Sequence, residues 1–271
     1  MHMRYETIRS LQLPKIGFGT WTIGGQGSPA PAEDGRSLSA LRSALELGYT
    51  HFDTAEGYAG GHAEQLLGQA IRESGIPRET LFITSKVSPD HLGYDEVLRS
   101  CENSLRRLGL ETLDLYLIHW PRVGMKLAET FRALNSLVRQ GKVRHLGVSN
   151  FNLKLLKQAA ALCETPLLTN QVSYSVPDRS CVLNGVLEFC QQNDILLTAY
   201  TPVKRRNIQS NPNLKAIAQS RGVTPHQVAL AWLTSQPRVI AIPMSFNPQH
   251  QLENLQAADI VLSDEEMRLL G

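Results

Sequence analysis

The chain has 271 residues, 42% of them hydrophobic and 19% charged, which is the composition of a folded globular protein and excludes a disordered one. Its formal net charge is only +2, and its longest basic run is Lys204-Arg205-Arg206, so we expect no nucleic-acid and no membrane role. The sequence has no apolar stretch near the roughly 18 residues that span a bilayer.

The four cysteines show neither a Cys-x-x-Cys pair nor the spacing of a zinc site. We therefore expect free thiols in a reducing compartment and no bound metal. The N-terminus lacks the apolar core of a signal peptide, which favours a cytoplasmic protein.

In chain order, residues 5–13 alternate in a way that predicts a short hairpin, and residues 16–19 predict a first strand. The Gly- and Pro-rich loop that follows lacks the Gly-x-Gly-x-x-Gly fingerprint of a Rossmann fold. A helical pattern begins at Ser37 and stops at Gly48, and a strand over 51–53 follows it.

The alternation of strand and helix continues to the end of the chain. Further strands are predicted at 82–86, 114–119, 145–149, 168–172, 196–200 and 239–243, with helices between them, for example at 94–108. Capping boxes at Thr224–Gln227 and Ser263–Glu266 open the last helices. Eight βα units predict one α/β domain over residues 1–271, a (β/α)8 TIM barrel with an N-terminal hairpin and a short C-terminal helix. The alternative, a doubly wound open sheet, would have a phosphate-binding glycine loop after its first strand.

Several predicted strands end on polar residues. Asp53, Lys86 and His119 close three successive strands at intervals of 33 residues, and Tyr58 follows in the loop after Asp53. In a barrel these ends meet at one mouth, so the four side chains form a candidate proton-handling set. Taken singly, each also fits a structural role: a helix N-cap, a half-buried tyrosine, a solvated lysine and a structural histidine.

Together the four residues suit one reaction. An ammonium about 4 Å from a phenol favours the phenolate by about 4 kcal/mol, so Lys86 is predicted to lower the pKa of Tyr58 from its usual value near 10. Asp53 supplies the counter-charge that keeps Lys86 protonated, and His119 donates a hydrogen bond to an oxygen that gains charge. The set therefore predicts general-acid chemistry on a carbonyl that becomes an alkoxide.

The motifs resemble those of the aldo-keto reductase family over almost the whole chain, most closely its bacterial and archaeal members grouped with diketogulonate reductases. The matching segments are GFGTW (17–21), HFDTAEGY (51–58), GHAEQLLG (61–68), ITSK (83–86), LDLYLIHWP (113–121), GVSNF (147–151), NQVSYS (170–175) and TAYTP (198–202). The resemblance implies a barrel with a nicotinamide coenzyme across its mouth and no metal. It assigns the catalytic tetrad to Asp53, Tyr58, Lys86 and His119, with Tyr58 as proton donor.

The resemblance also implies the coenzyme and substrate contacts. Ser149, Asn150 and Gln171 would hold the carboxamide and Tyr200 would stack on the nicotinamide, although Ser149-Asn150 also fits a helix cap. The further expected coenzyme contacts are Thr20, Trp21, Asp53, Thr201, Pro202, Val203, Ser245, Phe246, His250, Glu253 and Asn254. Trp21, Tyr58, His119 and Trp120 would line the substrate pocket. The implied activity is NAD(P)H-dependent reduction of aldehydes and some ketones.

Two features depart from the family pattern. The family's 2′-phosphate segment reads Ile-Pro-Lys-Ser with an Arg six residues after the Lys, whereas this chain has Met244 and His250 at those positions. NADP(H) is therefore only slightly favoured, NAD(H) is competitive, and the 204–206 cations are an alternative phosphate contact. The sequence ends at Gly271, directly after the last helix, which predicts an open pocket that accepts many small aldehydes.

Two other classes of protein compete with the reductase prediction. One is a coenzyme-binding regulatory subunit. The complete catalytic tetrad argues against this class. The other is a metal-dependent barrel hydrolase, for which only Asp53 and His119 are candidate ligands. We expect a small-molecule carbonyl substrate and a monomer.

Overall fold

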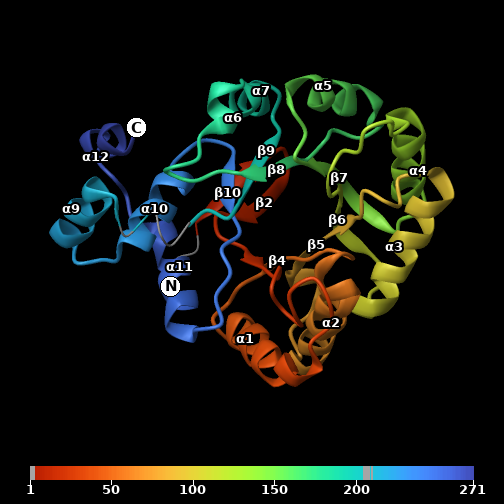
Figure 1. Ribbon diagram of the computed structural model, residues 1–271, viewed down its shortest axis with the longest axis horizontal. Coiled ribbons are helices and arrows are strands. Elements are labelled where there is room, and N and C mark those ends of the chain that lie inside the picture. The colour runs from red at the N-terminus through yellow and green to blue at the C-terminus, as the bar shows by residue number, and fades with distance from the viewer. Residues whose placement is uncertain (1–3, 204–207, 209) are drawn as a thin grey trace.

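The computed structural model describes residues 4–203, 208 and 210–271, and a parallel sheet lies at its centre (Figure 1). Eight strands pair in the order β10-β9-β8-β7-β6-β5-β4-β3, and every neighbouring pair is parallel. The strands are β3 (Phe18–Gly19), β4 (His51–Asp53), β5 (Phe82–Val87), β6 (Leu113–Ile118), β7 (Val143–Ser149), β8 (Thr169–Ser173), β9 (Leu196–Tyr200) and β10 (Val239–Ala241).

Hydrogen bonds between the first and last strands close the sheet into a barrel. Gly17 N donates to Ala241 O at 2.8 Å, and Ala241 N donates to Lys15 O at 2.9 Å. The (β/α)8 prediction is thereby confirmed over the open-sheet alternative. The first strand was predicted over 16–19, but its ladder to β4 starts only at Phe18, because Ile16 instead forms a bridge to Ala241.

Helices follow every barrel strand and surround the sheet (Figure 1). The helix predicted at 94–108 is α3, and both predicted capping boxes are present, whereas α1 begins at Asp34, three residues before the predicted start. The α-helices are α1 (Asp34–Glu46), α2 (His62–Ser74), α3 (Tyr94–Leu108), α4 (Leu127–Arg139), α5 (Leu153–Leu162), α6 (Ser180–Leu183), α7 (Val186–Gln192), α9 (Pro212–Arg221), α10 (Pro225–Thr234), α11 (Pro248–Gln256) and α12 (Asp264–Leu270). Short 3₁₀ helices are η1 (Pro31–Glu33), η2 (Tyr58–Gly61), η3 (Arg78–Thr80) and η4 (Ala257–Asp259).

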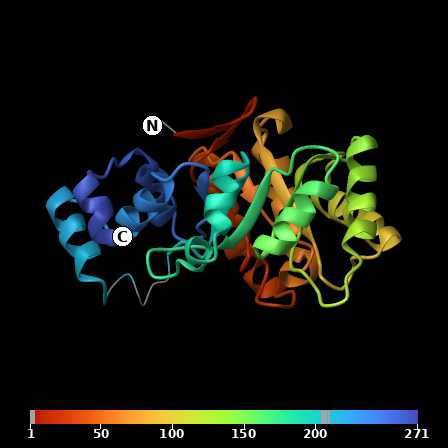
Figure 2. The ribbon, with the colours of Figure 1, turned by 90° about the horizontal axis from the view of Figure 1, so that it is seen from above.

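The predicted N-terminal hairpin consists of the antiparallel strands β1 (Tyr5–Ile8) and β2 (Leu11–Pro14). It lies across one end of the barrel (Figure 2). Its buried residues Ile8 and Leu13 belong to one apolar cluster with Leu115, Leu117 and Ile240 of the barrel strands. Burial of each such side chain is worth about 1.5–3 kcal/mol, so this apolar contact fixes the hairpin over the barrel.

An ion network joins the hairpin to the barrel. The buried ammonium of Lys15 pairs with the Glu6 carboxylate and also donates to the carbonyl of Val239 at 3.1 Å. Arg238 Nη1 pairs with the other oxygen of Glu6 at 2.7 Å. Burial alone raises the pKa of Glu6, but Lys15 and Arg238 outweigh it and hold that pKa below its ordinary value.

Two expectations concern the cysteines and the membrane. All four cysteines (Cys101, Cys163, Cys181 and Cys190) are free thiols, as expected. Across the described residues, no helix combines the length and the apolar character that crossing a membrane requires.

Replacing Glu6 with Ala should lower the free energy of unfolding by about 3 kcal/mol, because it leaves the buried Lys15 ammonium without its counter-charge. Urea denaturation followed by circular dichroism measures this change. Glu73→Ala, which removes an exposed partner of Arg42, should leave the midpoint unchanged. Equal effects of the two substitutions would contradict the prediction.

Candidate active site

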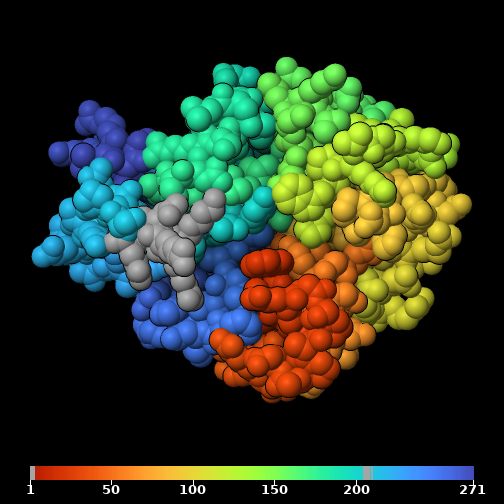
Figure 3. Space-filling model, viewed as in Figure 1, coloured from red at the N-terminus to blue at the C-terminus, as the bar shows by residue number. Residues whose placement is uncertain are grey.

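A cavity of about 840 Å³ opens at the carboxyl ends of the barrel strands. The space-filling view shows it as a hollow at the centre of the face seen in Figure 3. Among the predicted site residues, those that line it are Thr20, Trp21, Asp53, Tyr58, His119, Trp120, Ser149, Asn150, Gln171, Tyr200, Thr201, Pro202 and Val203. The lining also includes Gly19, Thr22, Gln26, Gly57, Ile242, Pro243 and Met244. Thr22 and Gln26 are not among the site residues predicted from the sequence, and both lie in the irregular Gly-rich loop after β3.

Lys86 approaches the cavity from the barrel interior, and its side chain is fully buried. Its ammonium donates to Asp53 Oδ1 at 2.5 Å, to the carbonyl of Thr54 at 2.8 Å and to Tyr58 Oη at 3.1 Å. Burial alone lowers the pKa of Lys86, but the negative charge of Asp53 and the contact with Tyr58 outweigh it and raise that pKa. Lys86 is therefore an ammonium at neutral pH, as the sequence predicted.

Tyr58 opens the 3₁₀ helix η2 directly after the loop that follows β4. Burial raises the pKa of its phenol, and the nearby Lys86 charge lowers it by less. The prediction that Lys86 brings this pKa below its ordinary value is therefore wrong in this structure. Burial destabilises the phenolate by more than the Lys86 ammonium stabilises it. Tyr58 thus keeps its proton at neutral pH.

His119 comes directly after β6, and its backbone N–H donates to the carbonyl of Val87 at 3.0 Å. Its ring meets the Tyr58 ring edge to face, with centroids 5.5 Å apart. Burial, aided by the Lys86 charge, lowers the pKa of His119 to about 3. The imidazole is therefore neutral and has one N–H to donate and one nitrogen to accept.

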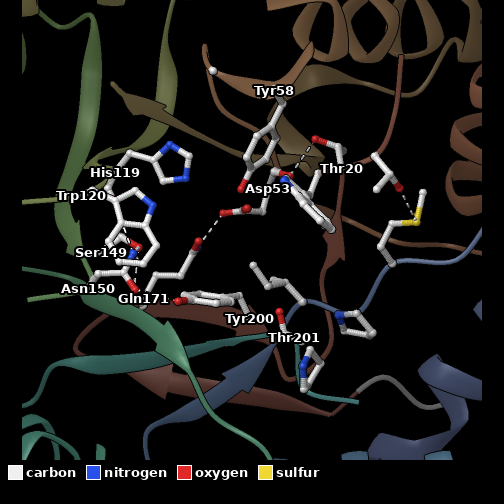
Figure 4. Close-up of a pocket in the computed structure, with 18 of the residues that line it drawn as sticks. Thr20, Asp53, Tyr58, His119, Trp120, Ser149, Asn150, Gln171, Tyr200 and Thr201 are labelled. Carbon is white, nitrogen blue, oxygen red and sulfur yellow. Dashed lines mark hydrogen bonds between the residues drawn. The ribbon is translucent and has the colours of Figure 1, made fainter. Parts of the chain in front are cut away.

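A row of amide and hydroxyl groups continues from Asp53 along the cavity wall (Figure 4). Gln171 Nε2 donates to Asp53 Oδ2 at 2.7 Å, and Ser149 Oγ donates to the backbone carbonyl of Gln171 at 2.8 Å. Asn150 Nδ2 donates to the carbonyl of His119 at 3.1 Å, while Tyr200 Oη donates to Asn150 Oδ1 at 2.8 Å. The row fixes the orientation of each of these side chains.

Two tryptophans stand at the rim of the cavity. Trp21 is 66% exposed and Trp120 is 47% exposed, which is unusual for so large an apolar side chain. Thr20, which directly precedes Trp21, fixes the backbone at this point of the rim, because its backbone N–H and its hydroxyl both donate to the backbone carbonyl of Asp53. The rim therefore offers aromatic surface to an apolar or planar ligand.

Met244 also lines the cavity, and its sulfur accepts a hydrogen bond from Thr22 Oγ1 at 3.4 Å. The predicted coenzyme contacts beyond it do not line the cavity but continue along the segment into α11: Ser245, Phe246, His250, Glu253 and Asn254. Asn254 is buried. The predicted contact through Lys204, Arg205 and Arg206 lies outside the described residues.

The hydrolase alternative needs a set of metal ligands. Over the stretches 4–203 and 210–271, no group of three or more His, Cys, Asp and Glu side chains is arranged to hold a metal ion. The described residues therefore give that alternative no ligand set.

The fold is a closed β/α barrel in which a phenol, an ammonium and a carboxylate lie in contact at the carboxyl ends of the strands, which is where barrel enzymes carry their active sites. Residues 15–270 match the model of the aldo/keto reductase family. The chain belongs to this family and is an oxidoreductase.

Similar proteins agree with this assignment. The methylglyoxal reductase YeaE of Escherichia coli is 36% identical over 269 residues, which cover 96% of this chain and 90% of the relative. The thermostable aldo-keto reductase Tm1743, solved with the inhibitor epalrestat, has a TM-score of 0.93 at 44% identity, with 99% of this chain and 98% of that chain covered. An aldo/keto reductase of Klebsiella pneumoniae, solved with NADP and acetate, has a TM-score of 0.88 at 37% identity, with 99% of this chain and 94% of that chain covered.

The cavity residues fit a nicotinamide coenzyme. A carboxamide needs a donor and an acceptor opposite it, and the side chains of Asn150 and Gln171 carry both kinds of group. The planar nicotinamide ring needs a planar surface to stack on. The Tyr200 ring provides one, and its hydroxyl is hydrogen-bonded to Asn150. The cavity volume is also within the range of small-molecule sites.

The imidazole of His119 should stay neutral from pH 8 down to pH 5, because its pKa lies near 3. NMR titration of the histidine ring protons measures this, and His119→Gln identifies the signal. His62 is an internal control, since its hydrogen bonds to Gln65 and Asp34 raise its pKa above the ordinary 6.5. A His119 midpoint near 6.5 would show that burial does not control this group.

Proposed function

We propose that this protein reduces aldehydes, and some ketones, to alcohols with NAD(P)H. The observation that carries the proposal is the contact of the Lys86 ammonium with both Asp53 and Tyr58 at the wall of the cavity. The glyoxal and methylglyoxal reductases among its relatives support an aldehyde substrate. The NADP in a solved structural relative supports the coenzyme class.

In the proposed mechanism, a nicotinamide coenzyme bound in the cavity would supply the hydride that reduces the carbonyl carbon. Tyr58 donates its phenolic proton to the carbonyl oxygen, and Lys86 stabilises the phenolate that remains. Asp53 keeps Lys86 charged through its 2.5 Å contact. The neutral His119 donates a hydrogen bond to the same carbonyl oxygen, where charge develops in the transition state.

The coenzyme contacts proposed here use the polar row of the cavity wall. Ser149, Asn150 and Gln171 would hold the carboxamide, and Tyr200 would stack on the nicotinamide ring. Asn150 and Thr201 support a functional role, because both are non-glycine residues with positive φ, 63° and 49°. Such conformations cost about 1–3 kcal/mol each and occur preferentially at functional sites.

The proposed substrates are small, uncharged carbonyl compounds that rest between Trp21 and Trp120. Both rings are well exposed, and apolar contacts of this kind discriminate between substrates by only about 1–3 kcal/mol per group. The enzyme should therefore accept many aldehydes.

We also propose that residues 1–271 act as one barrel domain in a cytoplasmic monomer.

Tyr58→Phe should lower kcat for methylglyoxal reduction by at least about 10²-fold, because it removes the proton donor. Coenzyme affinity should stay unchanged, which a fluorescence titration checks. Tyr5→Phe, which removes an exposed phenol on the hairpin, should keep full activity. If Tyr58→Phe retained more than a tenth of the wild-type kcat/KM, the assignment of the proton donor would fail.

Met244→Lys should tighten NADPH binding by at least about 1 kcal/mol and leave NADH binding unchanged, because it places a cation at the proposed 2′-phosphate segment. The two dissociation constants measure this, and wild type should prefer NADPH by less than about tenfold. Val261→Lys adds the same charge at an exposed position beyond α11 and should change neither constant. Equal effects of the two substitutions would indicate a general charge effect instead.

A further inference from the structure

We propose that Arg36 of α1 is the side chain that distinguishes NADPH from NADH by contacting the 2′-phosphate. Its guanidinium carbon lies 4.2 Å from the centroid of the Phe246 ring. Phe246 directly follows Ser245, and both lie on the segment that leads from the cavity into α11. The inference rests on the proposed binding of the coenzyme along this segment.

A buried hydrogen-bond bridge fixes α1 against this segment. Gln251 Nε2 donates both to the carbonyl of Ala40 on α1 at 3.0 Å and to the carbonyl of Ser245 at 2.8 Å. Gln251 is itself fully buried, and its backbone carbonyl accepts a hydrogen bond from Tyr49 Oη at 2.8 Å. The distance between α1 and Ser245 is therefore set by the fold rather than by mobile surface side chains.

The same neighbourhood is visible on the molecular surface. In Figure 3 the orange-red N-terminal segments and the blue C-terminal segments border one another beside the central hollow. The guanidinium of Arg36, on the first turn of α1, lies over the Phe246 ring of the segment before α11.

Arg36 is also the right kind of group and is free to act. Stacking on Phe246 holds the guanidinium plane and leaves its edge donors available, which suits a two-point contact with a phosphate. Among the described residues its ion partner is Glu33, 3.7 Å away, and both side chains are more than half exposed, so that pair is weak.

The segment itself has no strong cation. Residues 242–254 contain neither Lys nor Arg, and the Met244 side chain is an uncharged thioether. Ser245 and Asn247 offer hydrogen bonds but no charge. Arg36 supplies from another helix the positive charge that the segment lacks.

A purely structural role for Arg36 would affect the binding of NADPH and NADH differently from a phosphate contact. If the guanidinium only covered the Phe246 ring, its loss would loosen the segment and weaken NADPH and NADH alike. A phosphate contact instead acts on NADPH alone, because NADH has no 2′-phosphate. The ratio of the two dissociation constants separates these roles.

The test is a pair of fluorescence titrations, with NADPH and with NADH, on wild type and Arg36→Ala. We expect NADPH binding to weaken several-fold in the variant, enough to abolish the modest preference of wild type for NADPH, with NADH binding within twofold of wild type. Titration with 2′,5′-ADP and with ADP should show the same difference without a nicotinamide ring. Arg42→Ala, an exposed arginine later on α1 that pairs with Glu73, should change none of these constants.

An unchanged NADPH-to-NADH ratio in Arg36→Ala, whether both constants stay or both weaken equally, overturns the inference. If wild type still binds both coenzymes and reduces methylglyoxal in that case, the proposed function stands without Arg36. If wild type binds neither coenzyme, the proposed function and the inference fail together.

Discussion

The fully buried ammonium of Lys86 is the constraint on which the site depends. A charge removed from water is costly unless it is paired and hydrogen-bonded. Its three N–H groups meet three acceptors: the Asp53 carboxylate, the Thr54 carbonyl and the Tyr58 oxygen. Because the Tyr58 oxygen accepts from Lys86, its own O–H is left to donate elsewhere. The arrangement that stabilises the lysine therefore also leaves the phenolic O–H of Tyr58 available as a hydrogen-bond donor.

Much of the fold and of this set could be predicted from the sequence. Apolar runs that end on Asp53, Lys86 and His119 at equal spacing belong to successive βα units, and the barrel brings their ends together. Strand boundaries were less certain, because pairing between the first and last strands, which decides the extent of β3, is not local. The sign of the Tyr58 pKa shift was also mispredicted, since it depends on burial, which spacing does not reveal.

Other contacts between distant segments, away from this set, could not be predicted. The stacking of Arg36 on Phe246 joins α1 to the segment before α11, and no local pattern marks either residue. The tie between Gln171 and Asp53 is similar, because it crosses the barrel interior from β8 to β4. Such contacts arise from closure of the sheet, so they become visible only once the barrel is built.

The hairpin that covers the other end of the barrel has a kinetic consequence. With Ile8 and Leu13 packed into that end, the route to Tyr58 through the described residues is the mouth itself. A coenzyme against Tyr200 and Gln171 would occupy the deeper part of the cavity, and an aldehyde between the rim tryptophans would lie above it. The coenzyme would then have to enter before the substrate and leave after the product. The closed end of the barrel would thus impose an ordered sequence of binding and release.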